Sequence, residues 1–161
     1  MKQLTIVLTA VLLLVAAALA EERATVFRGL AWGDPPEALG NYRIQEDDGR
    51  VKTYTKENDQ YQLGPVRAIS ILYQFLDNRL FLIAVASRET EALERLIELR
   101  YGKPTYDTFR EKLWTSVAPD TDVYLKNDWD LAIMIIASKS ITEQAKKWQD
   151  SVEALEAQSA W

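Results

Sequence analysis

The feature that most constrains the fold is a pair of long apolar runs, each with a turn signal before it and a helix signal after it. The runs are LFLIAVAS, residues 80–87, and WDLAIMIIAS, residues 129–138. The turn signals are LDNR, residues 76–79, and Asn127-Asp128. Apolar runs of this length bounded by turn residues are typical of buried strands. The sequence therefore predicts two β-hairpins, each with a strongly apolar return strand.

A helix is expected after each hairpin. Residues 90–101, TEALERLIELRY, carry apolar side chains at helical spacing, and Gly102 is placed to end that helix. A second helix is expected to begin near Ser140, which has capping-box spacing to Glu143, and to run toward Leu155. Together with strands expected at residues 51–56, 66–75, 113–117 and 121–127, this order predicts an α+β fold. We expect a largely antiparallel sheet of about six strands with helices on one face.

The two hairpin–helix units resemble each other. At an offset of 51, residues 71–88 align with residues 122–139 without a gap, and the identities include Tyr73 with Tyr124 and Ser87 with Ser138. Internal duplication is one explanation. The other is that hairpins followed by helices share the same turn and cap chemistry.

The first twenty residues have the pattern of a signal peptide. Lys2 gives the positive start, residues 6–14 are apolar, and Ala18-Leu19-Ala20 is a small-residue cleavage site. We expect cleavage after Ala20 and a periplasmic or secreted product, with residues 21–161 forming a single α+β domain. An uncleaved membrane anchor is the alternative. No later segment is long and apolar enough to span a bilayer.

Composition narrows the function classes. After residue 20 the chain has 18 basic and 24 acidic residues, a balance that argues against nucleic acid or anionic lipid as partners. It has no cysteine and no histidine, so the usual zinc, copper and haem ligand sets and the Ser-His and Cys-His pairs cannot form. We expect no cofactor, no metal and no catalytic residue. A hydrolase would have to use carboxylates.

Both faces of the two apolar runs are apolar, in residues 80–85 and again in residues 131–136. An antiparallel sheet with one wet face should alternate instead, so the second face is expected to be covered. The cover is the N-terminal segment or the final helix, a dimer partner, or an apolar ligand. We expect the ligand or partner surface on this second face, around four aromatic residues: Tyr73, Trp114, Tyr124 and Trp129.

Two acidic pairs, Asp120 with Asp122 and Asp128 with Asp130, invite comparison with a calcium or magnesium site. They are expected at opposite ends of one hairpin, about 16 Å or more apart at strand rise. Solvated strand ends and turns explain them better than a shared metal.

The segment FRGLAWGDPPEALG, residues 27–40, has the residues of a short helix start. Asp34 is expected at the N-cap with Pro35 as the first helical residue, and Gly40 is placed to end the helix. Gly29 and Gly33 are expected to allow tight turns around Trp32, which should enter the core. An anion bound at the helix N-terminus is the alternative.

FRGLAWG followed by a short helix resembles an uncharacterised family of small bacterial proteins that bear signal peptides and an N-terminal F-R-G-I-x-W-G-like motif. The likeness continues through KTYTKENDQYQLG, ISILYQFLDNRLFLIAVAS, LIELRYGKP and LWTSVAPDTDVYL. DPP departs from the Ser/Thr-type N-cap of that family. The resemblance implies an exported, periplasmic domain and carries over no catalytic residue.

These observations favour an exported, non-catalytic binding or interaction domain for an unidentified protein or an apolar small molecule. A small hydrolase that uses carboxylates is one alternative. A homodimeric structural protein of the envelope is another.

Overall fold

The computed structural model describes residues 24–159, and the side chains of residues 24–150. These residues form a nine-stranded sheet in the order β1-β2-β4-β5-β9-β8-β7-β6, with β3 paired to β4 beside this path. Every described strand pair is antiparallel. The α+β class and the antiparallel sheet are confirmed, and the expectation of about six strands is wrong. The predicted signal peptide, residues 1–20, lies outside the described residues.

The described elements are, in order, η1 (Pro36–Leu39, a 3₁₀ helix), β1 (Tyr42–Asp48), β2 (Val51–Lys56), β3 (Gln62–Leu63), β4 (Val66–Leu76), β5 (Arg79–Ser87), α2 (Thr90–Tyr101), β6 (Tyr106–Asp107), β7 (Glu111–Ala118), β8 (Thr121–Asp128), β9 (Leu131–Ser138) and α3 (Lys139–Ser159). The strands absent from the prediction include β3 and β6, with two residues each, and β1, which is charged and mostly exposed. Such segments lack the apolar alternation by which a strand is recognised in a sequence.

One face of the sheet is buried, and we call it the covered face. Its side chains alternate along the central strands and include Ile71, Tyr73, Phe75, Ile83, Val85, Trp114, Val123, Leu125, Ala132, Met134 and Ile136. Helix α2 covers this face with Leu93 and Ile97, and the N-terminal segment covers it with Phe27, Leu30 and Leu39. Burial of these side chains is the main source of stability for a chain without disulfides.

The other face carries a continuous apolar row, and we call it the open face. Cross-strand pairing places five side chains side by side on β4, β5, β9, β8 and β7: Leu72, Ala84, Ile135, Tyr124 and Leu113. All five are partly exposed. The cover expected from the N-terminal segment does not lie here, because that segment packs on the covered face.

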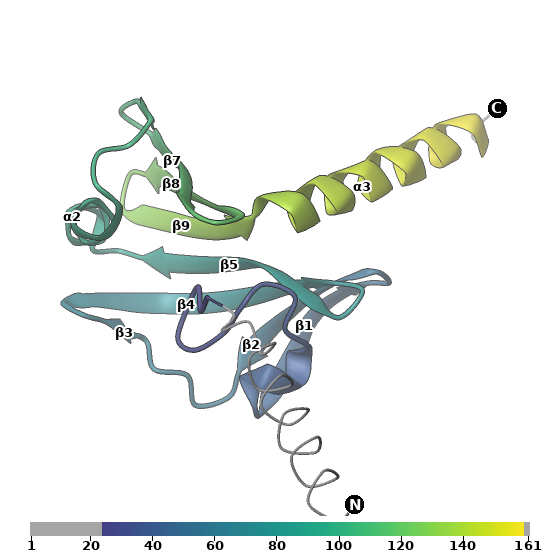
Figure 1. Ribbon diagram of the computed structural model, residues 1–161, viewed down its shortest axis with the longest axis horizontal. Coiled ribbons are helices and arrows are strands. Elements are labelled where there is room, and N and C mark those ends of the chain that lie inside the picture. The colour runs from purple at the N-terminus through teal and green to yellow at the C-terminus, as the bar shows by residue number, and fades with distance from the viewer. Residues whose placement is uncertain (1–23, 160–161) are drawn as a thin grey trace, which may run out of the picture.

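Helix α3 starts at the end of β9 and runs outward from the sheet (Figure 1). Ile141 and Ala145 in its first turns pack against Leu76 and Phe81 on the open-face side of the β4–β5 hairpin. The two helices therefore do not share one face, contrary to expectation. Arg88 and Glu89 separate β5 from α2 and let that helix fold back, whereas α3 follows β9 directly.

The turn between β8 and β9 lies at Trp129-Asp130 and not at Asn127-Asp128. Asp128 pairs with Leu131, so both strands continue beyond the expected turn. The first hairpin also differs, because Phe75 pairs with Leu80 and Gln74 with Leu82, which leaves a bulge in β5. The gapless alignment consequently fails in space: Tyr73 lies on the covered face and Tyr124 on the open face.

The segment FRGLAWG is a tight turn followed by a core anchor. Phe27 pairs with Leu30 across Arg28 and Gly29, which have φ angles of 49° and 82°. The positive φ of Gly29 explains the glycine, as expected. Trp32 is partly buried against the core and donates a hydrogen bond from Nε1 to Thr121 Oγ1 at 2.9 Å.

The predicted N-cap of the next helix is wrong. Pro35 occupies the N-cap position of η1, and no side chain caps this helix. The Asp34 carboxylate instead accepts a hydrogen bond from the backbone N–H of Ala31 at 2.8 Å, which closes the preceding turn. Gly40, with φ of 79°, ends the helix as predicted.

Candidate functional site

The four aromatic residues expected on one surface do not lie together. Tyr73 and Trp114 are buried on the covered face, each about 1% exposed. Tyr124 is partly exposed on the open face. Trp129 is 87% exposed at the β8–β9 turn, with the Arg110 guanidinium 5.7 Å from its ring centroid. Only Tyr124 belongs to the predicted second face.

Tyr73 takes part in a polar network that has a structural role. Its hydroxyl donates to Asp59 Oδ2 at 2.8 Å, and Arg28 Nη1 donates to Asp59 Oδ1 at 2.7 Å. Burial, together with this hydrogen bond, raises the pKa of Tyr73 above its usual range. Arg28 Nη2 also donates to the carbonyl of Gln62 at 3.0 Å. The network fastens the N-terminal turn to β3 and to the loop before it.

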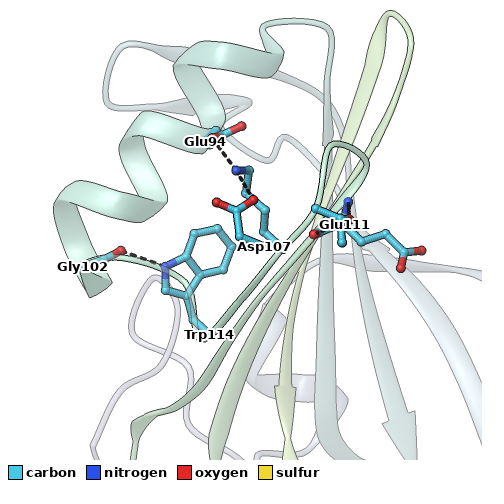
Figure 2. Close-up of polar contacts among 7 residues, drawn as sticks. Glu94, Gly102, Asp107, Glu111 and Trp114 are labelled. Carbon is cyan, nitrogen blue, oxygen red and sulfur yellow. Dashed lines mark hydrogen bonds and ion pairs between the residues drawn. The ribbon is translucent and has the colours of Figure 1, made fainter.

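Trp114 and its neighbour Lys112 fasten α2 to the sheet. Figure 2 shows the hydrogen bond from Trp114 to Gly102 at the end of this helix. Trp114 Nε1 donates to the carbonyl of Gly102 at 2.8 Å. Lys112 Nζ lies 2.5 Å from Asp107 Oδ1 and 3.1 Å from Glu94 Oε1. Its hydrogen bond to Asp107 raises the pKa of Lys112, which keeps this amine in its protonated form.

Glu111 lies on the side of β7 opposite Trp114, as Figure 2 shows. It pairs across the strands with Lys126, at the border of the open face. Burial, with a hydrogen bond to Glu111, raises the pKa of Tyr124 to about 12. The phenol is therefore neutral at physiological pH, and this part of the open face is an apolar surface with a polar edge.

The acidic pairs have separate roles. Asp120 accepts hydrogen bonds from Ser138 Oγ at 2.5 Å and from the backbone N–H of Ser140 at 2.8 Å, so it holds the start of α3. Asp122 accepts one from the backbone N–H of Ser116 at 2.6 Å. Asp128 is at the other end of β8. Within the part of the chain that the structure describes, no three acidic, histidine or cysteine residues form a metal-binding group.

The start of α3 also differs from the predicted capping box. Ser138 Oγ accepts a hydrogen bond from the backbone N–H of Ile141 at 3.3 Å, which makes Ser138 the N-cap. Ser140 Oγ donates to Asp120 Oδ2 at 2.8 Å. The cap therefore lies two residues before the predicted position, and a carboxylate from the preceding turn completes it.

A cavity of about 330 Å³ opens between α2, the N-terminal turn and β3 with the glycine that follows it. Met134 and Ile136 of β9 form its floor, and Leu96 and Ile97 of α2 form one wall. Arg100, from the last turn of α2, also lines it. No local sequence pattern predicts this cavity, because its lining comes from segments that are distant along the chain.

Comparisons of this chain with protein-family models, curated proteins and solved structures found no match. Among residues 24–159, no helix is both long and apolar enough to cross a membrane. Two features of the geometry are candidate sites. One is the open face with its projecting helix α3, and the other is the cavity beneath α2.

Proposed function

We propose that this chain is an exported, non-catalytic interaction domain that pairs with a second copy of itself through the open face. One observation carries the proposal. An apolar row crosses five strands without a cover from the described residues, while a long helix leaves the same side of the sheet. Contiguous exposed apolar surface of this kind marks interaction sites in soluble proteins.

The chemistry of the open face supports a protein partner. The apolar row is flanked on one side by Ser70, Ala86, Ile133, Lys126 and Glu111. It is flanked on the other side by Gln74, Leu82, Ala137 and Asp122. An apolar centre with polar residues at its ends is the usual anatomy of a protein interface.

Helix α3 supplies the complementary surface. At about 1.5 Å per residue its 21 residues extend roughly 32 Å. Within residues 139–150, where its side chains are described, it contacts the body through Ile141, Gln144, Ala145 and Trp148. By sequence spacing, Val152 and Leu155 continue the stripe of Ala145 and Trp148. An amphipathic helix of this length needs a surface on which to bury the rest of its stripe.

A second copy satisfies both needs at once. In a two-fold dimer the same patch is used on each protomer, so each α3 lies across the open face of the partner. Stable dimers bury about 1,200 Å² or more in total. The reciprocal contact of two helices with two rows buries twice the area of a single helix on a single row.

The proposal includes internal duplication of the hairpin–helix unit. At an offset of 51, Leu82 of β5 corresponds to Ile133 of β9, and Ala86 of β5 corresponds to Ala137 of β9. The β5–β9 ladder pairs Leu82 with Ala137 and Ala86 with Ile133, so exchanging the two units leaves these pairs in register. Ser87 and Ser138, equivalent at this offset, are both fully buried and both accept a backbone N–H at the start of a helix. If the two units arose by duplication, the bulge at Phe81 is a single residue inserted into the first unit.

Export rests on the leader, residues 1–20, and on the resemblance of FRGLAWG to the exported family. Expression in a Gram-negative bacterium followed by intact-mass analysis of the periplasmic fraction tests it. The expected product begins at Glu21. A product that keeps Met1 contradicts export by cleavage after Ala20.

The pairing is tested by native mass spectrometry of the chain from residue 21. We expect a dimer for the natural sequence and a monomer for Ile135→Lys, which places a charge in the centre of the apolar row. Ile44→Lys is the matched control, because Ile44 is 49% exposed on edge strand β1 and lies outside the open face. A monomeric natural sequence contradicts the proposal, as does a dimer that Ile135→Lys leaves intact.

A further inference from the structure

We propose that the cavity beneath α2 binds a small carboxylate amphiphile, that is, an unbranched apolar chain with one carboxylate head group. The cavity lies on the covered face, so this site is separate from the open face and does not rest on the dimer. Its volume of about 330 Å³ is at the lower end of the range for small-molecule sites. Its floor and wall are formed by side chains without charge, Met134 and Ile136 of β9 and Leu96 of α2.

The charge of the lining selects an anionic head group. Two arginines, Arg28 and Arg100, line the cavity, and no carboxylate does, in a chain with a net charge of −5. Asp59 neutralises Arg28 through an ion pair of 2.7 Å. Arg100 has no acidic partner among the described residues, and its guanidinium lies 5.4 Å from the ring centroid of Tyr101.

One unpaired guanidinium fits one carboxylate. The planar fork of arginine can bind both oxygens of a carboxylate. A dianionic phosphate would call for a second unpaired cation, and Arg28 is already held by Asp59 and by the carbonyl of Gln62. The head group is therefore placed at Arg100, with the apolar chain directed toward Met134 and Ile136.

Part of the lining is held in a fixed geometry. Arg28 has a positive φ, and its side chain is tied to Asp59, which also accepts the hydroxyl of Tyr73. Gly64, which also lines the cavity, has a φ of 57°. A preformed site loses less conformational entropy on binding than a mobile one.

Methionine methyl NMR reports on this site directly. Met134 lies in the cavity floor, and the only other methionine of the sequence is Met1. Titration with decanoate below its micelle concentration should shift the Met134 methyl signal and saturate. Octanoate should bind about 15-fold more weakly, because each buried methylene changes affinity roughly fourfold. Decanol, which lacks the charge, should bind about tenfold more weakly than decanoate.

Two variants separate the head-group contact from the apolar contact. Arg100→Gln should weaken decanoate about tenfold and leave decanol unchanged. Arg95→Gln is the control, since Arg95 is exposed on the same helix and does not line this cavity. Leu96→Trp should fill the cavity and abolish both titrations, with thermal unfolding measured to show that the variant is folded.

Three results would overturn the proposal. The first is a Met134 methyl signal that does not respond to decanoate. The second is equal binding of decanoate and decanol with no effect of Arg100→Gln, which would leave an apolar void without head-group selection. The third is unchanged decanoate binding in a folded Leu96→Trp variant, which would place the ligand elsewhere.

Discussion

The covered face and the open face are built by the same strands from alternate residues, and they have different surroundings. Ile83 and Ile135 are both isoleucines of the two central strands, yet Ile83 is fully buried and Ile135 is partly exposed. The difference comes from the connections, because α2 and the N-terminal turn both fold onto one face. Apolar sequence on both sides of a strand thus shows that both faces need a cover, without showing where the cover comes from.

The largest expected effect compares these two isoleucines. Ile83→Ala should lower the free energy of unfolding by about 3–4 kcal/mol, because it leaves a cavity in the core. Ile135→Ala should cost about 1 kcal/mol in the monomer, since less of its side chain is buried. Urea unfolding at low protein concentration, where pairing contributes least, measures both values. Equal losses would show that the open face is covered within one chain.

The next effect concerns the start of α3. Asp120→Ala removes the carboxylate that accepts from Ser138 Oγ and the N–H of Ser140, and should cost about 1–2 kcal/mol. Asp128→Ala, at the exposed end of the same strand, should stay within about 0.5 kcal/mol. The urea midpoints of the two variants give the comparison. An Asp120→Ala variant as stable as Asp128→Ala would show that this cap does not hold α3.

The same cap predicts a pH dependence. Burial tends to raise the pKa of Asp120, but hydrogen bonds from Ser138 and Ser140 outweigh it and lower the pKa below 3.8. The stabilisation is therefore complete above the unfolded-state pKa and is lost as pH falls through the folded-state pKa. From pH 7 down to about pH 3, the stability difference between the natural sequence and Asp120→Asn should stay constant to about pH 5 and then shrink. A difference that is constant over this range would contradict the assignment.

The smallest effect concerns the ion pairs of Lys112, one of which joins α2 to the sheet on the covered face. Lys112→Gln breaks ion pairs to Glu94 and Asp107 and should cost about 1 kcal/mol, because Lys112 is only 13% exposed. Arg43→Gln removes an exposed pair with Glu57 and should change stability by less than about 0.5 kcal/mol. Thermal unfolding of both variants measures the two losses of stability. A larger loss for Arg43→Gln would reverse the ranking of covered and exposed contacts.

Much of the fold could be predicted from local patterns. The first hairpin turn, helix α2 and its end at Gly102 follow from residues adjacent in sequence. The β8–β9 turn was misplaced by two residues, because Asn127-Asp128 is a strong turn signal and the burial of Ala132 favours a longer ladder. At this turn, tertiary packing outweighed the local preference of Asn127-Asp128 for a turn.

The candidate site was less predictable. Tyr73 and Tyr124 looked equivalent in the sequence, and a one-residue bulge at Phe81 puts them on opposite faces. The direction of α3 depends on the absence of a linker after Ser138, which the predicted cap at Ser140 concealed. The cavity depends on contacts between segments distant in sequence, and no local pattern encodes it.

The central claim, that α3 of one copy lies on the open face of another, is tested most directly by interchain paramagnetic relaxation. The sequence has no cysteine, so Gln149→Cys gives a single site for a spin label on an exposed position of α3. The labelled chain is mixed with a ¹⁵N-labelled natural chain. We predict broadening of amide signals around Tyr124 and Ile135 and none around Arg95 on the outer side of α2. Unchanged signals in β8 and β9 would contradict the account.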